Sequence, residues 1–234
     1  MMGLQQAQEQ LCAMGCKLIT SGLTAGTWGN LSLRVDACNV AITPSGRDYS
    51  TLQPRDIPCV DLQSGAYQGP KPSSECQLHL AVYRQRREIN AIIHTHATNA
   101  SVVAAARREV PPILDDLVQL AGPTVRCAAY ALPGTGRMAR ATLKALRGRN
   151  AALLANHGAV CLGRNLEEAF TCCLVLEKGC KAFIEAEFLG GAKAINRFEA
   201  TLMHQYYLRK YSKRKDKSMS IVKKLTNMTI FLDS

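Results

Sequence analysis

The order in which strand and helix patterns follow one another constrains the fold of this chain most. In its first third, short runs such as NLSLRV and NVAITPSG alternate apolar and polar residues between turn residues, which is typical of antiparallel hairpins. Further on, helical patterns stand between buried strands, as KPSSECQLHLAVYRQR does before INAIIHTH. Hairpins followed by helix-linked strands, without strict alternation of strand and helix, predict an α/β fold with a mixed sheet flanked by helices.

The helices are predicted from apolar residues at helical spacing and from signals at their ends. Gly22 follows the first helix as a stop signal. Ser74 and Gln77 have the spacing of a capping box, and Asn165 and Glu168 form a second cap signal. The predicted helices cover residues 4–20, 75–86, 99–107, 111–122, 136–148, 165–191 and 197–215.

Length and charge indicate one large domain with a basic tail. A chain of 234 residues with 47% apolar residues can bury one full core, and no segment resembles an interdomain linker. Residues 209–224 carry eight basic side chains and one acidic one, and therefore contribute +7 of the net charge of +11. We expect one domain over residues 1–212 and a solvated, flexible tail over residues 213–234. The tail lacks interleaved aromatic residues, so we expect no nucleic acid or membrane partner.

The sequence also predicts a cytoplasmic location. No apolar stretch approaches the roughly 20 residues that cross a bilayer. The N-terminal run MMGLQQAQEQL lacks the basic and apolar regions of a secretory signal. The ten cysteines are scattered and form no C-x-x-C pair, so we expect reduced thiols rather than disulfides.

The run AIIHTHA raises the possibility of a metal site. Residues two apart on a strand share a face, so His94 and His96 can converge on one ion, although the same spacing also fits two structural histidines. His157 follows an apolar strand at a turn relieved by glycine, and Glu75 lies in the first turn of a helix. Three imidazoles and a carboxylate suit a divalent ion, Zn²⁺ above all, with Glu75 as the ligand that substrate displaces and frees as a base. His79, one turn after Glu75, is expected to support this set or to pack.

Three short segments can hold an anion beside this metal. TAGTWGN, TPSG and PSSE each offer small hydroxyls and backbone N–H groups that no large side chain blocks. Each alone also fits an ordinary turn or cap. Because the last segment leads directly into Glu75, together they predict a phosphate pocket next to the metal.

These motifs resemble a known family. GLTAGTWGNLSLR, ITPSG, KPSSECQLH, AIIHTHA and LLANHGAVCLGRNLEEAF occur in the order and at the spacings of the class II aldolase/adducin family, and the resemblance to its bacterial L-fuculose-1-phosphate aldolases is the strongest. It extends over about residues 22–187. It implies a three-layer α/β/α domain with a mixed, largely antiparallel central sheet, and a homotetramer with active sites at subunit interfaces.

The resemblance also implies a reaction: reversible cleavage of a ketose 1-phosphate, of the L-fuculose or 5-deoxypentulose type, to dihydroxyacetone phosphate and an aldehyde. Zn²⁺ or another divalent metal would be held by His94, His96, His157 and Glu75, and Glu75 would also be the catalytic acid and base. The substrate phosphate would be held by Gly29, Asn30, Ser45, Gly46, Ser73 and Ser74.

The aldehyde side departs from the family pattern. A tyrosine is expected shortly after the PP turn, where this chain has Asp115 and a second aspartate, and a further tyrosine is expected from the C-terminal segment. Candidates there are Tyr206, Tyr207 and Tyr211. The departure leaves open a dehydratase, a decarboxylase or a 4-epimerase of sugar phosphates. A non-catalytic adducin-like binding module is disfavoured because the complete metal set is present.

Overall fold

The computed structural model describes residues 2–210, so the predicted tail over residues 213–234 lies outside the described residues. The strands are β1 (Asn30–Arg34), β2 (Asn39–Ile42), β3 (Cys59–Asp61), β4 (Tyr67–Gln68), β5 (Ala91–Thr95), β6 (Arg126–Ala128), β7 (Ala151–Leu154) and β8 (Gly158–Gly163). The helices are α1 (Leu4–Thr20), the 3-10 helix η1 (Pro54–Asp56), α2 (Cys76–Gln85), α3 (Thr98–Ala105), α4 (Asp115–Ala121), α5 (Gly136–Ala145) and α6 (Leu166–Phe188). A last helix begins at residue 197.

The strands within residues 2–210 form one sheet of eight, in the order β4-β3-β2-β1-β5-β8-β7-β6. Neighbouring strands are antiparallel throughout, except for the parallel pair β6 and β7. The hairpins of the first third fill one half of the sheet, and β5 joins them to the other half by pairing with β1 and β8. The predicted mixed, largely antiparallel sheet is therefore confirmed.

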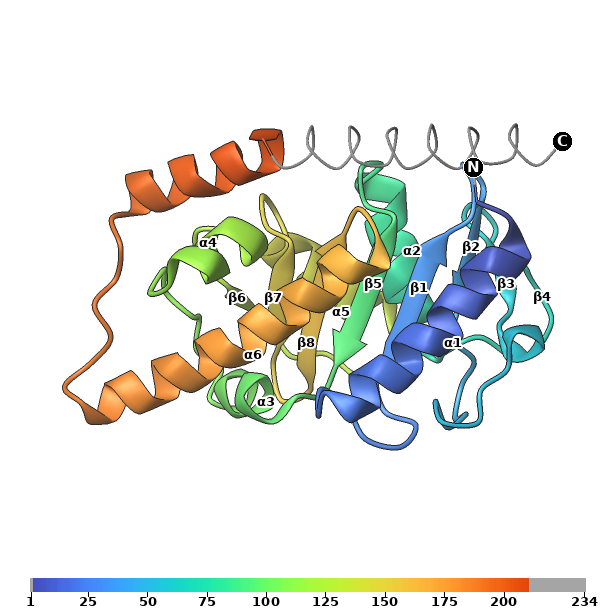
Figure 1. Ribbon diagram of the computed structural model, residues 1–234, viewed down its shortest axis with the longest axis horizontal. Coiled ribbons are helices and arrows are strands. Elements are labelled where there is room, and N and C mark those ends of the chain that lie inside the picture. Colours follow the sequence, from blue (N-terminus) through green and yellow to red (C-terminus); the bar gives the residue numbers. More distant parts are fainter. Residues whose placement is uncertain (1, 211–234) are drawn as a thin grey trace, which may run out of the picture.

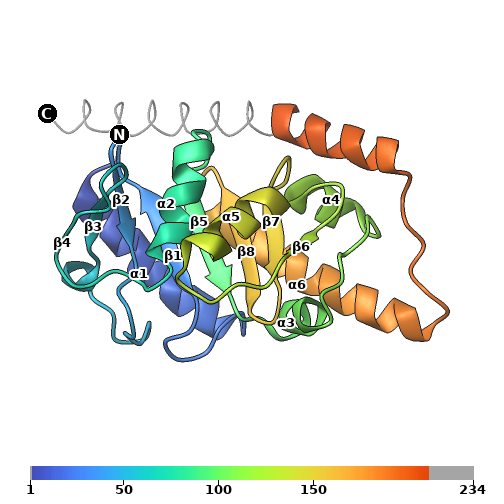
Figure 2. The same cartoon turned by 180° about the vertical axis from the view of Figure 1, so that it is seen from behind.

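Helices cover both faces of this sheet. In Figure 1, α1 and α6 lie in front of the strands, with α3 and α4 beside α6, and Figure 2 shows α2 and α5 on the opposite face. Two apolar cores result, one under each helix layer. The three-layer α/β/α arrangement is confirmed.

The alternation of side chains along β5 decides which layer receives the site. Ile93 belongs to the core under α1 and α6, whereas Ile92 belongs to the core under α2 and α5. His94 lies two residues after Ile92 on the same strand and therefore faces the α2 side of the sheet. Asn30 of β1 lies opposite His94 in the antiparallel pair of β1 and β5. This register brings the loop before β1 next to His94.

The predicted capping of two helices has different outcomes. The Asn165 side chain accepts a hydrogen bond from Glu168 N–H at the start of α6, as expected. Ser74 does not cap α2, because Glu75 occupies the N-cap position and has no side-chain cap bond. The preceding segment is held elsewhere: Ser73 N–H donates to Thr43 O at 3.0 Å. This pairing draws the PSSE and TPSG segments together and removes Ser74 from the capping position.

The last helix packs against α4 through a buried histidine. His204 is 2% exposed, and its Nδ1 lies 2.9 Å from Gln119 O, which requires that Nδ1 carries the proton.

Among residues 2–210, no helix combines the length and the apolar composition of a membrane span.

Candidate active site

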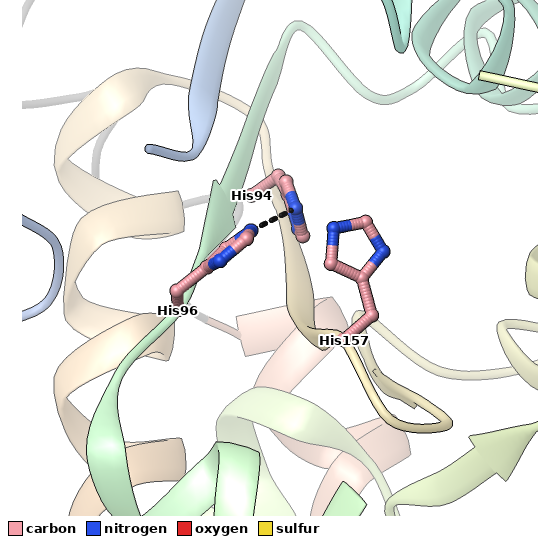
Figure 3. A group of neighbouring side chains, drawn as sticks. All are labelled: His94, His96 and His157. Atoms are coloured by element: carbon pink, nitrogen blue, oxygen red, sulfur yellow. Dashed lines mark hydrogen bonds between the residues drawn. The ribbon is translucent and has the colours of Figure 1, made fainter. Parts of the chain in front are cut away.

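Three imidazoles meet where β5 ends (Figure 3). His94 and His96 come from the end of β5, and His157 comes from the turn between β7 and β8. One ring nitrogen of each can be chosen so that all three lie within 4.8 Å of one another. The β5–β8 register places Ala159 opposite Thr95, and so brings the turn beside the end of β5. The predicted grouping of the three histidines is thus seen in the structure.

The contacts of His94 fix which of its ring nitrogens carries the proton. His94 Nδ1 lies 2.9 Å from the carbonyl oxygen of Ala159, so Nδ1–H is the donor and Nε2 carries a lone pair. That Nε2 lies 2.9 Å from His96 Nε2 and 3.2 Å from Glu75 Oε2. Burial lowers the pKa of His94 to about 3 and that of His96 to about 4. Both rings are therefore neutral at neutral pH, which is the form that binds a metal.

Glu75 completes the group with a carboxylate. Its residue is 5% exposed, and Oε2 accepts a hydrogen bond from Asn30 Nδ2 at 2.7 Å. Oε1 is buried and has no hydrogen-bond partner among the described residues; it lies 3.3 Å from His157 Nε2. A buried carboxylate oxygen without a partner is costly. A cation between it and the imidazole lone pairs would offset that cost, so these residues fit a divalent metal.

A directed chain of hydrogen bonds holds Glu75 from behind. Because Asn30 donates through its amide nitrogen to Glu75, its Oδ1 must accept, and His79 Nε2–H donates to it at 2.6 Å. His79 Nδ1 then accepts from the Ser32 hydroxyl at 2.6 Å, and the Ser32 oxygen lies 2.9 Å from the Tyr83 hydroxyl. Burial lowers the pKa of His79 to about 3, so it stays neutral. The structure thus places His79 behind the carboxylate rather than among the three converging imidazoles.

A cavity of about 240 Å³ opens in front of this group. Its lining comprises Thr27, Trp28, Gly29, Asn30, Pro44, Ser45, Gly46, Ser73, Ser74, Glu75, His96, Pro133 and His157. All six residues predicted to hold phosphate are therefore together beside the carboxylate and two of the imidazoles. Gly29 and Gly46 have φ values of 76° and 68°, a backbone conformation that suits glycine.

Of the residues predicted for the aldehyde side, the three that the structure describes, Asp115, Tyr206 and Tyr207, do not line this cavity. Asp115 begins α4, and its neighbour Asp116 pairs with Lys178 of α6. Tyr206 and Tyr207 lie on the last helix, away from the cavity lining. Tyr211 lies outside the described residues. A role for these four in catalysis stays a prediction.

Three cavity residues carried no role in the sequence analysis: Trp28, Pro44 and Pro133. A sequence signal for the first was present, since Trp28 is the single tryptophan of the chain and stands in a glycine-rich loop. Pro133 had no such signal, because only the tertiary structure brings the loop after β6 against the start of α2. Gly134 marks that approach: a Cβ there would lie 2.8 Å from Ser74 O.

Comparison with known proteins agrees with this geometry. A family model described as "Class II Aldolase and Adducin N-terminal domain" matches residues 9–184. A 5-deoxy-D-ribulose 1-phosphate aldolase of Bacillus thuringiensis serovar kurstaki is 39% identical over 194 residues, which are 82% of this chain and 91% of the relative. A 5-methylthioribulose-1-phosphate/5-deoxyribulose-1-phosphate aldolase of Rhodospirillum rubrum is 38% identical over 163 residues, 69% of this chain and 73% of the relative.

The same similarity appears among solved structures. The structure of an L-fuculose 1-phosphate aldolase is 37% identical and superposes with a TM-score of 0.82, over 86% of this chain and 95% of that chain. The family-model match over residues 9–184 includes every residue that lines the cavity.

Proposed function

This chain belongs to the class II aldolase and adducin family and is a lyase of the class II aldolase type, and we propose that it cleaves a ketose 1-phosphate to dihydroxyacetone phosphate and an aldehyde with the help of Zn²⁺. A 5-deoxypentulose 1-phosphate is the favoured substrate and L-fuculose 1-phosphate the next, since the similar proteins are named for these sugars.

One observation carries this proposal: the Glu75 carboxylate, whose buried Oε1 has no hydrogen-bond partner among the described residues, lies beside three converging imidazoles at a cavity of about 240 Å³. His94, His96, His157 and Glu75 would hold the metal, and nitrogen-rich sets of this kind favour zinc. When bound, the metal supplies Lewis-acid polarisation of the substrate carbonyl. Gly29, Asn30, Ser45, Gly46, Ser73 and Ser74 would hold the phosphate, with the Asn30 amide already engaged by Glu75 and His79.

Glu75 would move the proton at C3. In cleavage, the C3–C4 bond breaks, its electron pair stays with the fragment that carries the carbonyl, and the Glu75 carboxyl gives C3 a proton. The proton of the C4 hydroxyl leaves to a base on the aldehyde side as C4 becomes the aldehyde carbon. In condensation, the Glu75 carboxylate removes the C3 proton again. The unpartnered Oε1 is free for this transfer, while Asn30 fixes the orientation of the group through Oε2.

Activity assays test the reaction directly. Zinc-loaded protein is given 5-deoxy-D-ribulose 1-phosphate or L-fuculose 1-phosphate, and dihydroxyacetone phosphate is measured by its reduction with NADH in a coupled assay. Glu75→Gln should fold normally and lose activity by at least about a hundredfold, whereas the exposed Glu185→Gln serves as a matched control with full activity. Turnover of methylthioribulose 1-phosphate without release of dihydroxyacetone phosphate would instead establish the dehydratase alternative.

Metal analysis tests the ligands. Bound zinc per chain should fall to near zero in His94→Ala and in His157→Ala. It should stay unchanged in His204→Ala, which removes a histidine that does not line the cavity. Unchanged zinc in the first two variants would refute the metal set.

We further propose a homotetramer whose active sites lie at subunit interfaces. Two observations support it. The described residues predicted for the aldehyde side, Asp115, Tyr206 and Tyr207, do not line the cavity of their own chain. The last helix exposes three large side chains at a spacing of four, Phe198, Leu202 and Tyr206, so they share one face. Mass measurement in solution tests the assembly. A mixture of inactive Glu75→Gln and Tyr206→Phe chains that regains activity would show that a neighbouring chain supplies the tyrosine.

A further inference from the structure

A second hollow, of about 350 Å³, lies between the C-terminal parts of α2 and α5, which run side by side in Figure 2. Its lining includes four basic residues and, among the described residues, no carboxylate: Arg86, Arg140, Lys144 and Arg147. The active-site cavity has the opposite composition, since Glu75 lines it and no described lysine or arginine does. The hollow therefore offers an anion a site that the active-site cavity does not.

The sequence around α5 has no acidic residue to balance this charge. Residues 117–166 contain no aspartate or glutamate and seven basic residues: Arg126, Arg137, Arg140, Lys144, Arg147, Arg149 and Arg164. Within α5, Arg137, Arg140 and Lys144 lie three and four residues apart, so like charges are neighbours on one helix face, which destabilises a helix. The helix dipole favours a cation only in the last turn, where Lys144 lies. The fold alone thus gives no reason for the other two.

Three of the four basic side chains in the hollow are available to a ligand. Arg86 is already engaged, because it pairs with Glu88 and donates to two oxygen atoms of the segment before β7. Arg140, Lys144 and Arg147 are exposed, and their side chains make no hydrogen bond or ion pair within residues 2–210. These three can therefore turn toward an anion without giving up a contact.

The shape of the hollow favours a compact ligand. Its volume falls in the range of small-molecule sites, and Val82, Leu143 and Leu146 give it an apolar wall that strengthens charge interactions nearby. Side chains four residues apart on a helix start only about 5–6 Å from each other, so the ligand must carry several negative charges close together. Linked phosphates do so, and arginine and lysine both bind them. A second copy of the chain is disfavoured, since two such faces would repel each other.

The hollow is separate from the active site. Glu75 is the N-cap of α2 and Arg86 is its C-cap, and the ten residues between them make the helix about 15 Å long. No described residue lines both cavities. A ligand in the hollow would therefore leave the active-site cavity open.

We propose that the hollow between α2 and α5 binds a small molecule with two or more linked phosphate groups, held by Arg140, Lys144 and Arg147. This site lies beyond the proposed function and does not depend on it.

Calorimetric titration of the full-length protein with inorganic tripolyphosphate tests the site at about 0.15 M salt, where long-range attraction is screened. We expect one tripolyphosphate per chain. Arg140→Gln/Lys144→Gln should weaken binding by at least about tenfold. Arg55→Gln/Lys193→Gln is the matched control, since it removes two exposed basic residues that do not line the hollow, and it should change the affinity by less than about twofold. Arg147→Gln alone should also weaken binding, and it alters only one exposed side chain.

Two further measurements identify where and what the site binds. Because tripolyphosphate also binds zinc, the titration is done with zinc-loaded protein and again after chelation, and the affinity should be the same in both. Binding that needs zinc, an equal loss in the two double variants, or no binding to the wild type would each overturn the proposal. Equally tight binding of a hexaglutamate peptide would also overturn it, in favour of an acidic protein segment. None of these outcomes changes the proposed aldolase reaction, which is assayed separately.

Discussion

Replacing His79 by leucine tests the hydrogen-bond chain behind Glu75. Leucine has a similar volume but neither ring nitrogen, so the change removes the bonds to Asn30 Oδ1 and to the Ser32 hydroxyl, each 2.6 Å long. Because burial holds the pKa of His79 at about 3, the ring is neutral and no charge is removed. The loss of stability in this variant therefore measures the contribution of hydrogen bonding alone.

The structure sets the size of the effect. His79 is the hydrogen-bond partner that the described residues provide for Asn30 Oδ1, so this acceptor becomes a buried, unsatisfied group and costs about 1–3 kcal/mol. Ser32 keeps its contact with the Tyr83 hydroxyl, so its loss is smaller, about 1 kcal/mol. The free energy of unfolding should fall by about 2–4 kcal/mol, which lowers Tm by on the order of 10 °C in a domain of this size.

Urea unfolding in the presence of a chelator measures this difference without the contribution of bound metal. His79→Gln is the matched variant, since its amide can still donate to Asn30, and it should stay within about 1 kcal/mol of the wild type. His79→Leu should also lower kcat more than it raises KM, because the Asn30 amide can then turn away from Glu75. If the leucine variant were as stable as the glutamine variant, the hydrogen bonds from His79 to Asn30 and Ser32 would not stabilise the protein as described.

Two further predictions follow from the geometry. Gly158→Ala would bring a Cβ onto the backbone oxygen of Thr95, so we expect a loss of about 1–3 kcal/mol in stability and a lower zinc content. Gly148→Ala is the control, because Gly148 has a φ of 71° but open space around it. This variant should lose about 1 kcal/mol in stability and keep its zinc. Equal zinc in both variants would contradict the close approach. Burial holds the pKa of His79 and of His94 at about 3, below the ordinary 6.5, so the unfolded chain takes up protons first as the pH falls. The unfolding free energy of metal-free protein should thus be largest above pH 6.5 and fall toward pH 3, by at most about 1.4 kcal/mol per pH unit for each ring; a flat profile between pH 7 and 5 would refute it.

Part of the histidine grouping was predictable because it depends on local geometry. A strand places residues two apart on one face whatever its neighbours are, so the pairing of His94 with His96 needed no knowledge of the sheet. His157 required more, namely that the turn between β7 and β8 lies beside the end of β5. Its place at a turn after an apolar strand suggested a third ligand, and the resemblance to a family implied the same. The grouping seen in the structure agrees with both steps.

The roles of Asn30 and Ser74 depend on contacts that no local pattern encodes. Asn30 was predicted from its loop as a phosphate ligand, yet its position opposite His94 in the β1–β5 register puts its amide between Glu75 and His79. Ser74 has the spacing of a cap, but pairing between the TPSG and PSSE segments moves the start of α2 to the following residue. For Ser74 a tertiary contact overrides a capping preference that the sequence expresses correctly. For Asn30 the tertiary contact adds hydrogen bonds to Glu75 and His79, and its role toward phosphate stays a prediction.

The site therefore has a rigid part and a variable part. Glu75, Asn30 and the imidazoles of β5 lie on or beside paired strands and are joined by buried hydrogen bonds, so a change there disturbs both chemistry and stability. Trp28 projects from a loop into solvent and buries little in the folded chain, so its replacement costs the fold almost nothing. The fold consequently tolerates a replacement at Trp28 far better than one at Glu75.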